Sequence, residues 1–220
     1  MILSISGLEK AYGKRRVLSG VDLEVGEGEC VALVGGNGSG KTTTLRAIAG
    51  LVRPDAGRIE IAGIDAVSDG SRARRHLSFL PQRPAFPGTL TVREALAFVA
   101  RLRGLPATRV EEEIGRCELA ALAGASVANL SGGEKQRLAL AAALLPEAAL
   151  ALFDEPSSNL DGHATAIFLS RAREITASGR ALLFTTHIPA DLEHLAGRVV
   201  TLSDGRAGES RLRVLAGGHA

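Results

Sequence analysis

Short runs of apolar and β-branched residues, separated by glycine-containing turns, occupy the first part of the chain. Their length and composition predict β-strands at residues 2–8, 17–25, 29–34, 58–61 and 77–80. The run at 29–34 is almost wholly apolar, a pattern typical of a strand buried on both faces. A glycine-rich segment ends that strand. Residues 41–49 then predict a helix with Leu45 and Ile48 on one side and Gly50 at its end.

The apolar spacing changes to a helical period at Thr91 and keeps it, with two glycine-containing breaks, to about Leu145. Further runs predict strands and one helix, in the order strand 148–153, helix 162–177, strand 181–185 and strand 198–202. This order predicts an α/β fold with a parallel-sheet core, residues 1–84 and 146–220, and an inserted helical subdomain at about 85–145.

The composition is consistent with one domain and a well-filled core, because 45% of the 220 residues are hydrophobic. The chain has 26 basic and 24 acidic side chains, and the absence of a concentrated basic face argues against a nucleic-acid partner. The short basic runs at 14–16 and 72–75 are interpreted as solvated surface. Cys30 and Cys117 lack metal-ligand spacing and are expected to be reduced thiols in the cytosol.

The sequence predicts no membrane-spanning segment and no signal peptide. The first ten residues lack a basic start followed by a long apolar stretch. The longest apolar tract, residues 138–153, is interrupted by Pro146 and Glu147 and is too short to cross a bilayer. A role at a membrane would therefore require a partner that supplies the membrane segment.

A glycine-rich segment between a predicted buried strand and a predicted helix has the spacing of a phosphate-binding loop. Glycines allow backbone N–H groups to surround a phosphate, and the helix N-terminus adds its positive dipole end. Lys41 supplies a charge for the β- and γ-phosphates, and the Thr42 hydroxyl is a predicted magnesium ligand. The nucleotide-binding residues predicted here are Gly35, Gly36, Asn37, Gly38, Ser39, Gly40, Lys41, Thr42 and Thr43.

Two adjacent carboxylates, Asp154 and Glu155, end the apolar run at 148–153. A buried strand normally excludes charge, so the pair suggests a function. Asp154 is predicted to hold magnesium through water, and Glu155 to polarise an attacking water molecule. The alternative is an ordinary exit from a strand into a loop, which the phosphate-binding loop in the same chain makes less attractive.

A second helix start lies at Ser131, where Ser131 and Glu134 have the spacing of a capping box. Gly132 and Gly133 leave the N–H groups at this helix start open to an anion. A capped structural helix that binds nothing is the alternative. It does not explain the two glycines, which cost a helix about 1 kcal/mol each.

The segment Leu130-Ser-Gly-Gly-Glu-Lys-Gln-Arg137 resembles the signature sequence of the ABC family of ATPases, with Glu134 in place of the more frequent glutamine. Other family motifs follow in order over nearly the whole chain. Tyr12 and Val17 resemble the adenine-contacting residues, and Gln82 resembles the glutamine that senses magnesium and links to the membrane partner. The loop at 156–161, ending in Asp161, resembles the loop that crosses the dimer interface, and His187 resembles the histidine that contacts the γ-phosphate.

The resemblance implies a single ABC ATPase domain spanning residues 1–220, a P-loop NTPase fold with a RecA-like core. An N-terminal antiparallel β subdomain and an inserted helical signature subdomain would complete it. It implies ATP and Mg²⁺ as ligands, with Lys41, Glu155 and His187 catalytic. Thr42, Gln82 and Asp154 would lie at the metal, and Ser131, Gly132, Gly133, Glu134 and Asp161 at the nucleotide.

The same resemblance implies two protein partners. A second cassette, most simply an identical copy, would pair head to tail so that each ATP lies between the phosphate loop of one copy and the Ser131 helix of the other. A separate membrane-spanning subunit would place the chain on the cytoplasmic face of the membrane. The segment 88–104 resembles compact bacterial exporter cassettes and favours export. The alternative is an ABC ATPase without a transport role, such as one that assists iron–sulfur cluster assembly. A nucleic-acid ABC protein is disfavoured, because the chain has no coiled-coil insertion, second cassette or basic face.

Overall fold

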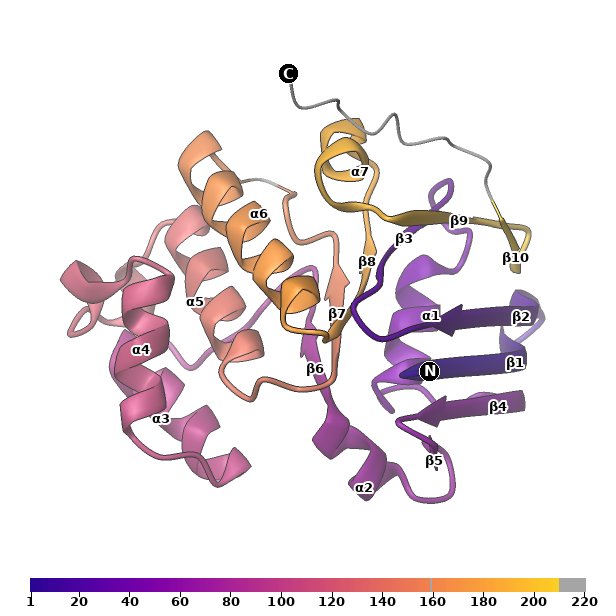
Figure 1. Ribbon diagram of the computed structural model, residues 1–220, viewed down its shortest axis with the longest axis horizontal. Helices are drawn as coiled ribbons and strands as arrows, with labels where there is room; N and C mark the ends of the chain where they lie inside the picture. The colour runs from indigo at the N-terminus through magenta and orange to yellow at the C-terminus, as the bar shows by residue number, and fades with distance from the viewer. Residues whose placement is uncertain (159, 210–220) are drawn as a thin grey trace.

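A computed structural model describes residues 1–158 and 160–209 (Figure 1). The strands are β1 (Leu3–Tyr12), β2 (Arg15–Val25), β3 (Cys30–Val34), β4 (Ala56–Ile61), β5 (Ile64–Asp65), β6 (Leu77–Leu80), β7 (Leu150–Asp154), β8 (Ala181–Thr185), β9 (Arg198–Ser203) and β10 (Arg206–Glu209). The α-helices are α1 (Lys41–Ile48), α2 (Gly70–Ala73), α3 (Val92–Arg103), α4 (Thr108–Arg116), α5 (Gly132–Leu144), α6 (Gly162–Ala177) and α7 (Pro189–Leu195). Three short 3₁₀ helices span Arg74–His76, Ala120–Leu122 and Val127–Asn129.

The central sheet has six strands in the order β10-β9-β3-β8-β7-β6. All neighbouring strands are parallel except the edge pair β9–β10, so the carboxyl ends of β3, β6, β7 and β8 lie at one edge of the sheet. At this edge, the glycine-rich loop follows β3, Gln82 follows the end of β6, Glu155 follows β7 and His187 follows the end of β8. Parallel topology thus brings four segments that are distant in sequence to one place, as is usual for ligand sites in open α/β sheets.

Each central strand contributes side chains to two hydrophobic cores. In β3, Val31 and Leu33 pack toward α1, whereas Ala32 faces α5 and α6. The side chains of β7 alternate in the same way: Leu152 lies in the core next to α1, and Phe153 in the core next to α5 and α6. The alternation follows from the two-residue period of a strand, and burial on both faces explains why these runs are continuously apolar.

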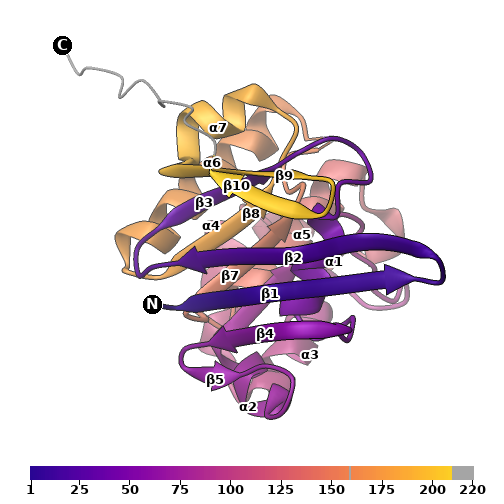
Figure 2. The same cartoon turned by 90° about the vertical axis from the view of Figure 1, so that its right-hand side faces the viewer.

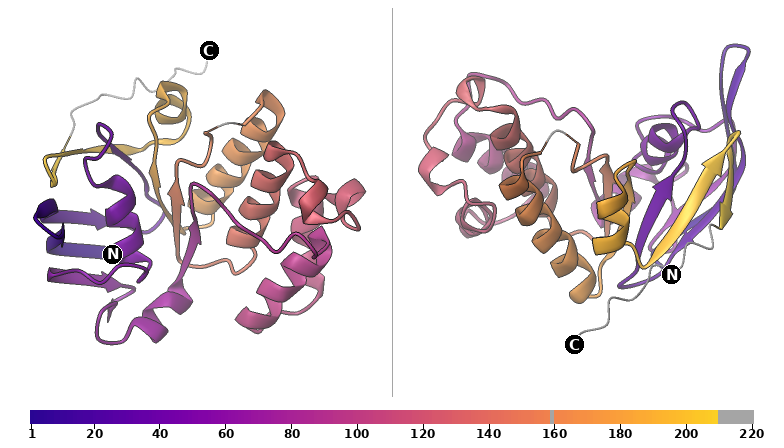
Figure 3. Two further views of the ribbon diagram at one scale, coloured as in Figure 1. Left: turned by 180° about the vertical axis from the view of Figure 1, so that it is seen from behind. Right: turned by 90° about the horizontal axis from the view of Figure 1, so that it is seen from above.

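A second, antiparallel sheet has the order β2-β1-β4-β5 and covers the α1 side of the molecule (Figure 2). Helices α3 to α6 lie on the opposite side (Figures 1 and 3). The predicted α/β fold, with its N-terminal antiparallel sheet and helices between β6 and β7, is therefore confirmed. The boundaries of the helical subdomain, 85–145, stay a prediction.

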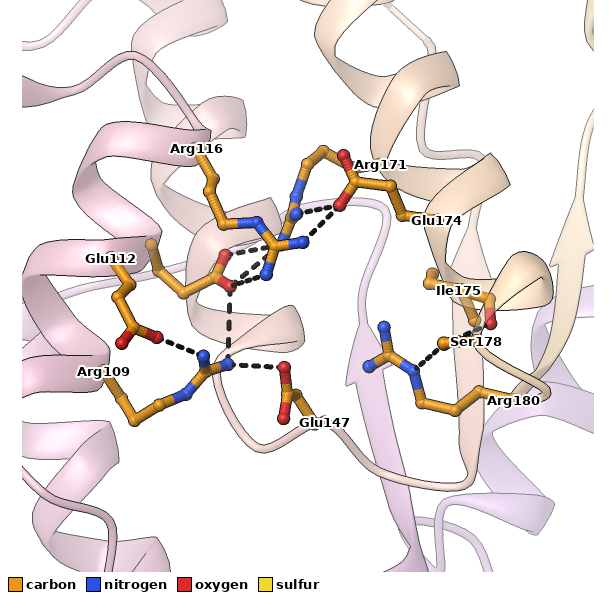
Figure 4. A network of polar contacts seen from close by, with 10 residues as sticks. Arg109, Glu112, Arg116, Glu147, Arg171, Glu174, Ile175, Ser178 and Arg180 are labelled. Carbon is orange, nitrogen blue, oxygen red and sulfur yellow. Dashed lines mark hydrogen bonds and ion pairs between the residues drawn. The ribbon is translucent and has the colours of Figure 1, made fainter.

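A network of charged side chains joins α4 to α6 (Figure 4). Glu113 of α4 is fully buried and accepts from Arg171 of α6, whose Nη2 lies 2.8 Å from both carboxylate oxygens. Arg116 and Arg109 approach the same carboxylate to 3.5 and 3.7 Å. Arg116 also pairs with Glu174 on α6. The network therefore fixes the helical segment against a helix of the sheet core.

Both cysteines are free and buried, consistent with the expectation of unpaired thiols. Burial raises the pKa of Cys30 and of Cys117 to about 12, so both stay protonated and unreactive at neutral pH. Within the described part of the chain, no helix has the length and apolarity needed to cross a membrane.

Candidate nucleotide-binding site

The glycine-rich loop joins β3 to α1 and packs tightly against two other strands. A Cβ on Gly35 would lie 2.3 Å from the carbonyl oxygen of Leu202 in β9, and one on Gly40 would lie 2.6 Å from Leu18 of β2. Gly40 also has φ of 109°, a conformation that side chains with a Cβ rarely adopt. Glycine is therefore required at both ends of the loop, independently of any ligand.

Two polar groups in this loop are suited to a bound anion. Lys41 is 7% exposed, and its Nζ donates to the carbonyl oxygens of Gly35 and Gly36 at 2.7 and 3.1 Å. The Oγ of Ser39 is buried without a hydrogen-bond partner in the described chain. The first turn of α1 contains no acidic residue that would compete with an anion at the helix N-terminus. These features fit a phosphate group.

Two of the three residues predicted at the magnesium ion, Thr42 and Asp154, lie together although 112 residues separate them. Asp154 is 1% exposed, and its Oδ1 accepts from Thr42 Oγ1 at 3.2 Å and from Thr185 Oγ1 at 2.7 Å. Residues 1–158 and 160–209 contain no cluster of three or more His, Cys, Asp or Glu side chains that could hold a metal. One carboxylate and one hydroxyl fit Mg²⁺, which usually binds few protein oxygens together with water and phosphate.

The three remaining predicted catalytic or sensing residues meet at the Glu155 carboxylate. Gln82 Nε2 donates to Glu155 Oε2 at 2.7 Å, and His187 Nδ1 lies 3.6 Å from the same oxygen. The Glu155 backbone is left-handed, with φ of 49°. Such a conformation costs a residue with a Cβ about 1 kcal/mol. Hydrogen bonds compensate, since Thr185 Oγ1 accepts from the Glu155 N–H at 2.9 Å and Ser158 Oγ donates to its carbonyl at 2.8 Å.

A cavity of about 430 Å³ opens over the phosphate loop. Its lining residues come from β2, the loop and α1, and the ends of β6 and β7: Arg15, Val17, Asn37, Gly38, Gly40, Lys41, Thr42, Thr43, Gln82 and Glu155. Tyr12 is 50% exposed and does not line the cavity, although it lies directly across the hairpin from Arg15. The Tyr12 ring instead forms a cation–π contact with Lys10, whose Nζ lies 5.7 Å from the ring centroid.

The predicted capping box at Ser131 is confirmed. Ser131 Oγ accepts from the Glu134 N–H at 3.3 Å, and Glu134 Oε2 accepts from the Ser131 N–H at 2.7 Å. The hydrogen bond from Ser131 holds the pKa of Glu134 below its usual range. Nothing lies within 4 Å of a Cβ built on Gly132, so space around the chain does not require glycine there. None of these residues lines the cavity described above.

Two residues at or near the candidate site were not recognised in the sequence. Arg15 lines the cavity, although its basic run was interpreted as solvated surface. Asp191 of α7 is buried, and its Oδ2 accepts from Thr186 Oγ1 at 2.6 Å and from Ser157 Oγ. Asp191 thereby joins the loop that follows Glu155 to the segment that carries His187. No local sequence signal distinguishes this carboxylate from its exposed neighbours.

Asp161 lies at the start of α6, at the end of the predicted interface loop. Its Oδ1 accepts from the Ala164 N–H at 2.8 Å, which caps the helix. Its other carboxylate oxygen lies 3.6 Å from a Cβ built on Gly133. The structure therefore brings the start of α6 next to the start of α5, but places neither at the cavity. Asn159 of the same loop lies outside the described residues.

The site combines three features: buried parallel strands, a glycine loop whose carbonyl oxygens bind the Lys41 ammonium, and carboxylates at the end of a neighbouring strand. Together they define a P-loop nucleotide-binding protein. The sequence model of the ABC transporter family matches residues 18–158. The chain therefore belongs to the ABC transporter family, as one of its ATP-binding cassettes.

Relatives with known names are consistent with this assignment. The chain is 37% identical over 93% of its length to the Nod factor export ATP-binding protein I of Ralstonia nicotianae, and 40% identical, again over 93%, to an ABC transporter ATP-binding protein of Bacillus subtilis. It spans 65% and 68% of those two proteins.

Solved structures show the same fold. An ATP-binding subunit of an ABC transporter aligns with a TM-score of 0.88 at 33% identity, covering 95% of this chain and 90% of that one. A dimeric cassette bound to ADP and phosphate, in a post-hydrolysis state, aligns with a TM-score of 0.86 at 25% identity, covering 94% and 98%.

Proposed function

We propose that this chain hydrolyses ATP as the motor subunit of an ABC transporter. The observation that carries the proposal is the convergence of Lys41, Thr42, Asp154, Gln82 and Glu155 at one edge of the parallel sheet. Loop N–H groups and the Lys41 ammonium would bind the phosphates of ATP, and Thr42 and Asp154 would hold Mg²⁺. The metal would neutralise charge on the β- and γ-phosphates.

Glu155 is the proposed catalytic base. Its carboxylate is 17% exposed at the cavity, so it is accessible to a water molecule that attacks the γ-phosphate. Gln82 holds one carboxylate oxygen, which orients the group, and His187 is close enough to contact both Glu155 and a terminal phosphate. Lys41, Glu155 and His187 are therefore proposed as catalytic.

The second proposed element is a head-to-tail dimer of cassettes. At the Ser131 helix start, no hydrogen bond from the Gly132 or Gly133 N–H is formed within residues 1–158 and 160–209. The Glu134 carboxylate is turned back onto the N-cap, and this helix start does not line the cavity of its own chain. A second copy would bring its Ser131, Gly132 and Gly133 to that cavity, with Asp161 at the interface. Such a site is complete only when the dimer closes on ATP, which couples nucleotide occupancy to motion.

The motion would drive a separate membrane-spanning subunit at the cytoplasmic face of the membrane. Support comes from the names of the relatives, several of which are Nod factor export ATP-binding proteins and one an ABC transporter ATP-binding protein. We infer export as the direction of transport. Co-purification of the chain from membranes of its source with a multi-helix protein would support the partner. Recovery only as a soluble complex would refute it.

Hydrolysis is tested by Glu155→Gln. The variant should bind Mg-ATP with unchanged affinity and lose turnover nearly to background, because the amide cannot accept a proton from water. Hydrolysis at half the normal rate would show that Glu155 is not the base.

The shared site is tested by complementation in the Glu155→Gln background. Lys41→Ala alone and Gly132→Asp alone damage both sites of a homodimer, so neither should dimerise with ATP. In a mixture, both defects fall in one site of a mixed dimer and the other site is intact. Mixing should restore part of the ATP-dependent dimer on size-exclusion chromatography. Normal dimerisation of either single variant would refute the shared site.

A further inference from the structure

A basic side chain at the start of β2 lines the same cavity as the phosphate loop. Strand pairing places Arg15 opposite Tyr12 at the end of the β1–β2 hairpin. Because strand side chains alternate, Arg15 and Val17 share a face, and both line the cavity. Arg16, the next residue, is exposed but is not among the lining residues.

The guanidinium of Arg15 lies against the middle of the loop. A Cβ built on Gly38 would be only 3.0 Å from Nη2 of Arg15. Over residues 1–158 and 160–209, no hydrogen bond or ion pair engages the Arg15 side chain, whereas Lys10 on the paired strand is held by Asp55 at 2.7 Å. Arg15 thus retains its donors at a position that faces the loop.

The charges around the cavity favour an anion on the Arg15 side. Among the lining residues the cations are Arg15 and Lys41, and the one carboxylate is Glu155. Glu155 already accepts from Gln82 at the end of the cavity formed by β6 and β7. Arg15 comes from the β1–β2 hairpin, and within residues 1–158 and 160–209 no ion pair joins it to Glu155, whose carboxylate contacts Gln82 and His187.

We infer that Arg15 is a nucleotide-binding residue that donates to the α- or β-phosphate of the bound nucleotide. The inference rests on the proposed function, since it takes the phosphate chain to lie over the glycine loop. A guanidinium presents paired N–H donors that match phosphate oxygens, and its charge is retained at every physiological pH. The position of Arg15, between the Tyr12 end of the hairpin and Gly38, favours a phosphate shared by ATP and ADP over the terminal one.

The test compares Arg15→Ala with Arg16→Ala, a neighbour of the same type and charge that points away from the cavity. Titration calorimetry in the Glu155→Gln background gives the affinity for Mg-ATP, Mg-ADP and adenosine. Arg15→Ala should raise the Kd for both ATP and ADP by roughly tenfold, the lower range for a hydrogen bond to a charged group. Adenosine affinity should not change, and Arg16→Ala should stay within about twofold for all three ligands, because it keeps every cavity contact.

Two further measurements separate contact from charge and from folding. Arg15→Lys should recover part of the affinity, because it keeps the charge and loses the paired donors. The affinity of Arg15→Ala should fall less steeply with added salt than that of the parent. The melting temperature should not change, since the side chain has no partner in the described fold.

Equal affinities for Arg15→Ala and Arg16→Ala would overturn the inference. A loss confined to ATP would overturn the assignment to the α- or β-phosphate, and an equal loss for adenosine would overturn phosphate contact. Lys41→Ala separates this outcome from failure of the proposed function. If the parent binds ATP and Lys41→Ala does not, an unaffected Arg15→Ala refutes only the role of Arg15.

Discussion

Replacing Arg171 by methionine should expose how strongly the buried charge network ties α4 to α6 (Figure 4). Arg171 is 5% exposed at its side chain and contacts both oxygens of the fully buried Glu113. Methionine is unbranched and uncharged and can replace the apolar stem of the arginine, so the change removes the ion pairs with Glu113 and Glu174 and leaves space only where the guanidinium lay. Among the described residues, Glu113 then keeps two cationic neighbours, Arg116 at 3.5 Å and Arg109 at 3.7 Å.

The magnitude follows from the burial of the carboxylate that remains. Breaking a buried pair by removing one partner costs about 3–5 kcal/mol. The two remaining arginines are farther away but still attract Glu113, so the lower end, about 3 kcal/mol, is expected. For a chain of this size that loss lowers the melting temperature by roughly 6–12 °C.

The double variant Glu113→Met, Arg171→Met is the matched control. It should regain most of the loss, because no uncompensated charge stays buried. The neighbouring arginines keep other partners, Arg109 with Glu147 at 2.9 Å and Arg116 with Glu174. If the double variant is as unstable as Arg171→Met, the cost arises from packing and not from the unpaired carboxylate.

The cost should also depend on pH. Burial raises the pKa of Glu113, and attraction by Arg171 opposes that rise. The pKa of Glu113 is therefore higher in the folded protein than in the unfolded chain. The stability that this group contributes is fully present below the pKa of the unfolded chain and is lost as pH rises through the pKa of the folded protein. Removing Arg171 raises the pKa further, so the difference from the parent should be largest at about pH 7.5 and smaller near pH 5.

Urea unfolding followed by far-UV circular dichroism suits this comparison, because the chain has no tryptophan. A loss below about 1 kcal/mol at neutral pH would refute the reasoning, because it would place the pair in the range of exposed salt bridges. A loss of the same size at both pH values would refute the contribution of Glu113 ionisation.

Three further predictions concern the proposed site. Tyr12→Ala should weaken ATP binding by about 1–3 kcal/mol in a titration, with no change in rate at saturating ATP, if the exposed ring stacks on adenine; unchanged affinity would place the base elsewhere. Asp191→Ala should lower kcat by about tenfold or more with little change in KM, because Ser157 and Thr186 lose the acceptor that positions their loops. Asp191→Asn keeps an acceptor oxygen and should restore activity. A shift confined to KM would contradict this prediction. Arg83 is exposed and follows Gln82, the residue expected to link to the membrane subunit, so the surface around Arg83 is predicted to contact that subunit. Arg83→Glu should abolish transport by a reconstituted transporter and spare basal ATP hydrolysis. Normal transport would place the contact surface elsewhere.

The sequence predicted those parts of the fold that have continuous apolar runs. β3, β7 and β8 are buried on both faces, so their runs were recognisable, and Gly50 and the capping box at Ser131 marked helix ends correctly. β5, α2 and β10 were missed because two to four residues show no period. α7 was missed although Pro189 stands at its first position, because the helix has only seven residues.

The candidate site could be predicted as far as contiguous motifs extend. Gly35 to Thr42 and Asp154 were recognisable because each motif is local and parallel topology brings strand ends together. Arg15 could not be recognised, because its role depends on which face of β2 points to the cavity and on the pairing of the hairpin. Glu113 also could not be distinguished, since it lies in a run of three glutamates of which it alone is buried.

Glu155 has a left-handed backbone conformation, which the sequence could not predict because residues other than glycine rarely adopt it. This conformation shows how the proposed base is positioned. The turn directs the chain out of β7 immediately after Asp154, so the two carboxylates have different roles: Asp154 stays buried against Thr42, and Glu155 reaches the cavity. Thr185 holds both, because its hydroxyl donates to Asp154 and accepts from the Glu155 N–H. One side chain of β8 therefore sets the relative placement of the proposed metal ligand and base. Since the chain runs from Thr185 to His187 within two residues, any shift of β8 would move all three proposed functional groups together.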